Sequence, residues 1–157
     1  MTTPISVSAD IAAAPSTVWA LVADLTRMGE WSPENEGAEW LRGARGPVVG
    51  ATFKGSNRLG SKTWTTHGRI VAADTERTLA FRITTMGMKV AEWRYELAAT
   101  TEGCTVTEAF TDERGPIIKA LGRLATGVKD RGSHNRATMQ TTLERLKAAA
   151  ESPRAAR

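Results

Sequence analysis

Between residues 51 and 110, apolar side chains recur at every second position, in segments that short turns separate. Leu79, Phe81 and Ile83 form one such series, and alternate residues from Ala91 to Leu97 form another. A period of two places successive side chains on opposite faces of a β-strand. Strands that follow one another through short turns pair antiparallel. This stretch therefore predicts an antiparallel meander with one face buried and the other in water.

The residues before this meander combine strand and helix patterns. Residues 5–11 alternate as a half-buried strand, and a further short strand begins at Trp40. Pro15 suits the first turn of a helix, and a second short helix is expected from Leu25 to Trp31. The sequence thus predicts an α+β fold with seven strands, in which two short helices separate the first strand from the second.

The residues after the meander predict a long helix that begins at Pro116. Two apolar stripes at helical spacing follow: Ile117, Leu121, Leu124 and Val128, and then Met139, Leu143, Leu146 and Ala150. Three glycines interrupt the first half, and each costs about 1 kcal/mol relative to alanine in a helix interior. We therefore expect a break or kink between Thr126 and Ser133.

Length and composition narrow the range of functions. A chain of 157 residues fits one domain, here 1–157, with a core at about 3–150 and a frayed tail at 152–157. The net charge of +4 comes from bases interleaved with acids, whereas a nucleic-acid footprint is a stripe on one face. We therefore expect no nucleic-acid partner. The oligomeric state stays open between monomer and homodimer.

Other patterns bear on location and on cofactors. Cys104 is the only cysteine, the N-terminus lacks a secretory signal pattern, and no apolar run approaches a membrane span. These observations predict a cytoplasmic protein without stable membrane insertion. His67 and His134 lack metal-ligand spacing, and no phosphate loop or dinucleotide fingerprint occurs. We therefore expect no metal and no cofactor, with His67 in solvent and Cys104 as a small buried residue.

Large aromatic side chains recur on the predicted inward face. The group comprises Trp31, Trp40, Phe53, Trp64, Phe81, Trp93, Tyr95 and Phe110. Any one of these rings could simply fill a core. A solid core, however, mixes its aromatics with many aliphatic residues, and few lie between these rings. The composition favours a lined cavity, in which the polar tips of Trp and Tyr can orient a guest.

Polar candidates lie next to this apolar face. Glu108 shares strand parity with its apolar neighbours and should point inward, where an unpaired carboxylate is costly. It could be structural, paired with Arg131, Arg136, Tyr95 or Trp64. It could also be a ligand anchor or a general acid/base with a raised pKa.

Three residues of the last helix are further candidates for the cavity wall. Arg131 and Asn135 precede Met139 by two turns and one turn, so all three can lie on one side of the helix. An exposed helix flank is the alternative for the two polar residues. Met86 and Met88, in a hairpin connection, could form a lip at the cavity mouth or pack as an ordinary loop.

Several segments together resemble a known superfamily. They are Ile11 to Pro15 with Val18-Trp19, Asp24 to Glu34, Gly50 to Asn57, Trp93 to Glu96, Val106 to Glu108 and Thr142 to Lys147. Their order resembles the START/Bet v 1-like (SRPBCC) proteins, in the polyketide cyclase/dehydrase and lipid-transport-like branch. The resemblance implies a helix-grip fold, with a curved sheet around the C-terminal helix and a cavity between them for lipids, sterols or polyketides. The superfamily has no universal catalytic motif, so the resemblance assigns no catalytic residue.

Three functional hypotheses follow. The first is binding or transport of a small apolar molecule, such as a lipid, a polyketide or an aromatic metabolite. The second is a polyketide cyclase or dehydratase that uses Glu108, assisted by Tyr95, Asn135 or Arg131. The third is a regulatory or interaction module with a vestigial cavity, which an exposed apolar patch would favour over a lined interior. The identity of the ligand stays open at this point.

Overall fold

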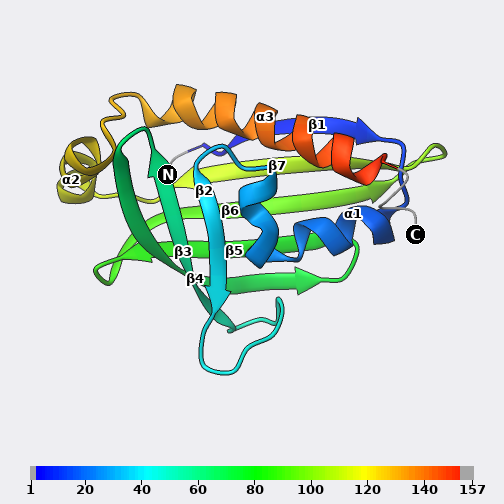
Figure 1. Ribbon diagram of the computed structural model, residues 1–157, viewed down its shortest axis with the longest axis horizontal. Helices are drawn as coiled ribbons and strands as arrows, with labels where there is room; N and C mark the ends of the chain where they lie inside the picture. The colour runs from blue at the N-terminus through cyan, green and yellow to red at the C-terminus, as the bar shows by residue number, and fades with distance from the viewer. Residues whose placement is uncertain (1–2, 153–157) are drawn as a thin grey trace.

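The computed structural model describes residues 3–152, and within them one antiparallel sheet of seven strands in the order β1-β7-β6-β5-β4-β3-β2 (Figure 1). The strands are β1 (Ile5–Ile11), β2 (Asn35–Trp40), β3 (Thr52–Leu59), β4 (Lys62–Asp74), β5 (Thr78–Thr85), β6 (Met88–Ala99) and β7 (Cys104–Asp112). β2 to β7 form the expected meander, and β1 pairs with β7. The predicted fold class is confirmed.

The β5–β6 turn shows how local chemistry sets the strand register. Thr85 pairs with Met88, so Met86 and Gly87 alone form the loop. Both have positive φ angles, 49° and 77°, as a two-residue type I′ turn requires. Such a turn matches the twist of the flanking strands, and it holds Met86 at the tip of the hairpin.

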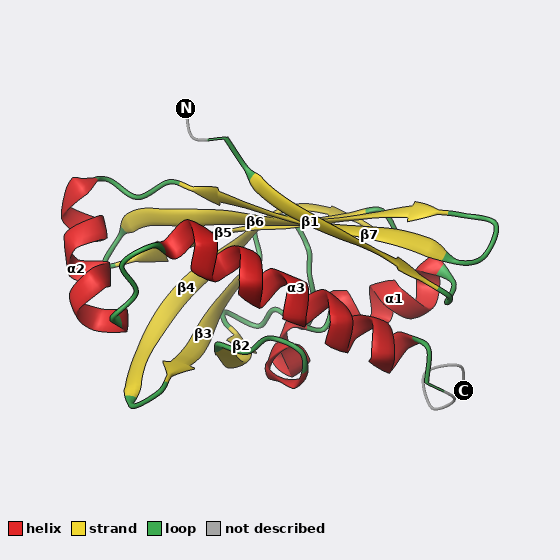
Figure 2. Ribbon diagram, turned by 90° about the horizontal axis from the view of Figure 1, so that it is seen from above, coloured by secondary structure: helices red, strands yellow, loops and turns green. Residues whose placement is uncertain are grey.

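Four helical segments accompany the sheet. They are α1 (Pro15–Val22), the 3-10 helix η1 (Leu25–Glu30), α2 (Pro116–Thr126) and α3 (Arg131–Ala150). The break predicted between Thr126 and Ser133 is confirmed, since Gly127 ends α2 at a φ of 73°. Asp130 then caps α3 by accepting a hydrogen bond from the Ser133 N–H. Figure 2 shows α3 and α1 on the same side of the sheet. The predicted tail at 152–157 lies, after Ser152, outside the described residues.

The solid core lies between the sheet, α1 and the C-terminal half of α3. Leu143 and Leu146 of α3 pack there with Val18 of α1 and with Leu79 and Val106 of the sheet. Burying a side chain of this size contributes about 1.5–3 kcal/mol. This core occupies one end of the sheet, and α2 lies at the other end (Figure 1). The N-terminal half of α3 therefore does not pack on this core.

The apolar stripe expected along α2 does not pack inward. Ile117 and Leu124 are 70% and 76% exposed, while their neighbour Ile118 is 5% exposed. The apolar pattern of α2 indicated a helix but gave the wrong buried side. α2 rests on the sheet chiefly through β4, so only one narrow side of it meets the rest of the protein. Ile117 and Leu124 therefore remain in solvent, whereas Leu121 is 42% exposed and Val128 is half-buried.

This orientation makes a stability prediction. Replacing Ile117 and Leu124 together with glutamine, a good helix former, should change the free energy of unfolding by less than about 0.5 kcal/mol. Ile118→Gln, on the same helix, should cost about 1–3 kcal/mol because it exposes a buried side chain. Urea denaturation measures both effects. A larger loss in the double variant than in Ile118→Gln would contradict the orientation of α2.

Candidate ligand cavity

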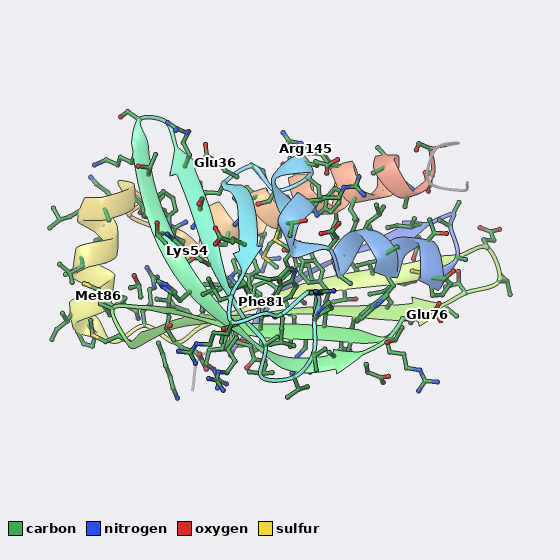
Figure 3. All side chains as sticks on the ribbon, turned by 60° about the horizontal axis from the view of Figure 1, so that its bottom comes forward. Glu36, Lys54, Glu76, Phe81, Met86 and Arg145 are labelled. Carbon is green, nitrogen blue, oxygen red and sulfur yellow. The ribbon has the colours of Figure 1, made fainter. Side chains whose placement is uncertain are left out.

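A cavity of about 280 Å³ lies between the concave face of the sheet, α2 and the N-terminal half of α3. Strands β2 to β7 contribute to its wall, and Ile118, Leu121 and Ala125 of α2 close one side. Met86 also lines it and is 72% exposed, so the mouth lies between the β5–β6 turn and α2. Figure 3 shows Met86 at the end of the molecule that carries α2. One of the two methionines thus lies at the mouth, as the lip hypothesis required.

Nine of the twelve candidate ligand-binding residues lie in the cavity wall. They are Phe53, Trp64, Phe81, Trp93, Tyr95, Glu108, Phe110, Arg131 and Asn135. Strand parity explains this result for the seven strand residues, because inward positions of neighbouring strands converge on one concave face. Helical spacing accounts for Arg131 and Asn135, which share one side of α3. Their role in binding stays a prediction.

The other three candidates lie outside the wall. Trp31 belongs to the solid core, with the Arg27 guanidinium over its ring. Trp40 packs edge-on against Phe53, with 5.8 Å between the ring centroids. Met139 is buried with other apolar residues behind the wall. These three residues therefore support the wall of the cavity, and a direct contact with a ligand stays a prediction for them.

Contacts between rings stiffen the apolar wall. Phe53 meets Phe81 edge-to-face, with centroids 5.4 Å apart, and Trp93 meets Phe110 at 4.8 Å. Each such pair contributes about 0.5–1.5 kcal/mol beyond the burial of its area. Phe53 also lies flat across Gly68 of β4, where a Cβ atom would fall 2.1 Å from the ring. The cavity is thus largely formed before any ligand enters.

Glu108 carries the buried carboxyl group of this wall. Its side chain points inward from β7 and is 2% exposed. Its Oε1 accepts a hydrogen bond of 2.8 Å from the Tyr95 hydroxyl, and within residues 3–152 its Oε2 has no partner. Burial raises the pKa of Glu108 to about 8, and the hydrogen bond from Tyr95 opposes this rise in part. At neutral pH the carboxyl group is therefore mainly protonated.

Tyr95 is correspondingly a firm hydrogen-bond donor. Burial, and then the neighbouring Glu108, raise the pKa of its hydroxyl well above the usual value. Of the structural partners predicted for Glu108, Tyr95 is the one that the structure shows. Arg131 instead donates two hydrogen bonds to Glu34, at 2.8 Å and 3.1 Å. The predicted pairing of Glu108 with Arg131 is therefore wrong.

Arg131 instead fastens one edge of the cavity. Its ion pair with Glu34 joins the start of α3 to the segment before β2, and its guanidinium lies over the Trp64 ring at 5.9 Å. His134 Nε2 lies 3.4 Å from the same Glu34 carboxylate. This pair is largely shielded from water, so it holds more firmly than an exposed ion pair. Arg131 thus serves the shape of the site.

The sequence reasoning missed a polar cluster on the opposite wall. The Asn35 side-chain amide donates to Asn57 Oδ1 at 3.3 Å, and the Asn57 amide donates to the Thr66 hydroxyl at 3.2 Å. All three residues line the cavity. The available signal was Asn57 itself: asparagine is rare in strands, and this one shares the parity of Phe53 and Gly55.

Two threonines of α3 were also missed, and they behave as apolar residues. The Thr138 hydroxyl donates to the Asn135 carbonyl, and the Thr142 hydroxyl donates to the Thr138 carbonyl. Such hydrogen bonds back to the helix occupy the hydroxyl groups. The two threonines therefore contribute mainly their methyl groups to the wall. As a result, the side of the cavity near Glu108 offers few hydrogen-bond partners.

The structure also tests the predicted exposure of His67 and the predicted burial of Cys104. His67 is exposed, as predicted, and Cys104 is buried at the start of β7, where burial raises the pKa of its thiol. No cluster of three or more potential metal-ligating His, Cys, Asp or Glu side chains occurs in the described part of the chain. Among residues 3–152, no helix has the length and apolar character needed to cross a membrane.

Comparison with known proteins identifies the family. The family model described as "Polyketide cyclase / dehydrase and lipid transport" matches residues 2–151. The chain therefore belongs to this family, and the resemblance seen in its sequence is confirmed. Among curated proteins, none matches this sequence.

Solved structures agree with this assignment. The Polyketide_cyc-like protein Cgl2372 from Corynebacterium glutamicum is 30% identical, with a TM-score of 0.60, over 96% of this chain and 91% of its own. The AHSA1-like protein from Aeromonas hydrophila is 19% identical, with a TM-score of 0.68, over 98% and 95%. The di-domain aromatase/cyclase StfQ of the steffimycin biosynthetic pathway is 15% identical, with a TM-score of 0.73, over 96% of this chain and 51% of its own. The last two likenesses show the helix-grip fold alone.

Proposed function

We propose that this protein binds a small, largely apolar molecule in its cavity and carries or presents it. The main support for this proposal is the aromatic wall around a cavity of about 280 Å³. One buried carboxyl oxygen in this wall lacks a partner within residues 3–152. A cavity of this kind gains affinity by removing apolar ligand surface from water, while the polar group fixes orientation. Membership of a family described by polyketide chemistry and lipid transport supports this choice.

The proposal includes a location and a partner class. A single cysteine, buried in β7, suits a reducing compartment, and we propose the cytoplasm. The partner is a small apolar molecule, and the proposal involves neither nucleic acid nor metal. The lined interior favours binding over a purely regulatory role with a vestigial cavity.

Two alanines of α2 allow a matched test. Ala125 lines the cavity, and Ala120 is exposed on the same helix away from it. Ala125→Trp should fill the space and weaken binding of the neutral fluorescent probe N-phenyl-1-naphthylamine by about tenfold or more, which corresponds to 1.4 kcal/mol. Ala120→Trp should leave the affinity within about twofold. Titration of probe fluorescence measures both affinities.

The two variants also distinguish a loss of binding from a loss of folding. Thermal unfolding of each confirms that the fold is intact before binding is compared. Equal probe affinity in both variants would place the binding elsewhere and contradict the proposal. The same holds for a wild-type protein that binds no apolar probe.

A cyclase or dehydratase is a second candidate function. The observation that favours it is the contact between Glu108 and Tyr95, because a carboxyl group with a pKa near 8 can exchange protons with a bound chain at neutral pH. Liquid chromatography with mass spectrometry separates the two functions, because a cyclase returns an isomer of equal mass with a different retention time. A binding protein returns its ligand unchanged, whereas a dehydratase returns a product lighter by one water molecule.

A further inference from the structure

Among the residues that line the cavity, Glu108 is the one with a buried side-chain oxygen that lacks a partner within residues 3–152, and its geometry specifies what it can recognise. We infer that the ligand carries an uncharged carbonyl group, as in a ketone, aldehyde, ester or quinone, and that the Glu108 carboxylic acid donates a hydrogen bond to it from Oε2. This inference rests on the proposed binding function and adds the chemical class of the ligand.

The hydrogen bond from Tyr95 decides which oxygen of Glu108 carries the proton. The Tyr95 hydroxyl donates to Oε1 at 2.8 Å, so Oε1 acts as the acceptor. In the acid form the proton then resides on Oε2, which has no partner within residues 3–152. Glu108 lines the cavity, so a guest that satisfies this buried O–H group has to reach it from there. A buried donor without an acceptor costs about 1–3 kcal/mol, which a ligand acceptor recovers.

Among the described residues that line the cavity, no cation is free to pair with Glu108. On β6 its cross-strand neighbour is Tyr95, and on β1 it is Val7. Asn135 faces the cavity from α3. The two arginines of the cavity wall are engaged elsewhere, Arg131 with Glu34 and Arg114 with Asp112. The carboxyl group therefore remains neutral instead of forming a buried ion pair.

This arrangement also excludes other ligand classes. An anionic ligand would leave its charge uncompensated at the apolar end of the cavity, which is strongly unfavourable. A purely hydrocarbon ligand would leave the Oε2 hydrogen unpaired. A protonated amine would need the carboxylate form, which is the minor form at neutral pH, so it is disfavoured relative to a neutral acceptor. A neutral acceptor is the class that satisfies the site as it stands.

Three naphthalenes of similar shape test the inference. They are 2-acetylnaphthalene, which has a carbonyl group, 2-ethylnaphthalene, which has none, and 1-(2-naphthyl)ethylamine, which has an amine. Near about pH 6, wild-type protein should bind the ketone about tenfold more tightly than the hydrocarbon, the equivalent of one net hydrogen bond. Near about pH 9.5, where Glu108 is ionised, this preference should disappear. Calorimetric titration gives the affinities.

Two substitutions at Glu108 provide the controls. Glu108→Gln has the same shape and keeps an N–H donor at the position of Oε2, so it should prefer the ketone at both pH values. Glu108→Leu should bind ketone and hydrocarbon equally at both. Circular dichroism at each pH confirms that the variants and the wild type are folded.

Each outcome has a distinct meaning. Equal affinity of wild type for ketone and hydrocarbon near pH 6, with both bound, overturns the inference and leaves the proposed function standing. Preference for the amine near pH 6 also overturns it, because the site would then act as a carboxylate at a pH where the inference requires the acid. Failure of all three compounds to bind overturns the proposed function together with the inference.

Discussion

Replacing Glu108 with glutamine is expected to remove a large part of the dependence of stability on pH between about pH 4.5 and pH 8. The folded-state pKa is raised, so above pH 4.5 the folded protein binds more protons than the unfolded chain. The free energy of unfolding therefore falls as the pH rises through this window, and it levels off above the folded pKa. At 1.36 kcal/mol per pKa unit, the wild type loses up to about 5 kcal/mol from this group.

Glutamine does not titrate, so the variant should be the more stable protein at about pH 8 and show a flatter profile. Urea denaturation at several pH values between about 5 and 9 measures the difference. Glu39→Gln, on an exposed position of β2, is the matched control and should keep the wild-type profile. Parallel profiles for wild type and Glu108→Gln would show that the carboxyl group is not buried as described.

Gly68→Ala is expected to destabilise the protein by about 2–3 kcal/mol, although it adds a single methyl group. The new Cβ atom would lie 2.1–2.6 Å from three atoms of the Phe53 ring. The ring has little room to yield, because Trp40 and Phe81 hold it edge-to-face from two sides. The clash must therefore displace part of the cavity wall, and thermal or urea unfolding measures the cost.

A second substitution tests the mechanism of this loss. Phe53→Leu removes ring atoms from the clash, so the double variant should lose less stability than the sum of the single variants. Gly122→Ala is the control for the general effect of glycine replacement. Its Cβ would make only an ordinary contact at 3.6 Å, and it should gain about 0.5–1 kcal/mol within α2. Strict additivity of the Gly68 and Phe53 substitutions would contradict the proposed contact.

The sequence predicted the parts of this protein that depend on local periodicity. Alternation located the strands, the glycines located the end of α2, and parity alone turned Glu108 inward. The reason is that a strand with one buried face must keep its apolar side chains in register with its neighbours. The same reasoning placed seven strand residues in the cavity wall, and helical spacing added Arg131 and Asn135, which makes nine of the twelve candidates.

The parts that were not predicted depend on distances between elements. The apolar residues of α2 show a helix, but they do not reveal that its support comes from β4 and from the side that carries Ile118. Trp40 shares its inward face with Phe53, yet only the curvature of the sheet decides which ring reaches the cavity. The partner of Glu108 was one of four possibilities until the β6–β7 register placed Tyr95 opposite it.

Between the sheet and α3, side chains fill the space at the end near α1 and leave a cavity at the end near α2. Leu146 and Val106 lie in the first region, and Glu108, Trp64 and Ile118 lie in the second. Selection can therefore act on the two regions almost separately: one set of positions maintains folding, and another is free to vary with the molecule that is bound. A lineage with this architecture can acquire a new ligand without rebuilding its scaffold, and an engineer can diversify the hollow end in the same way.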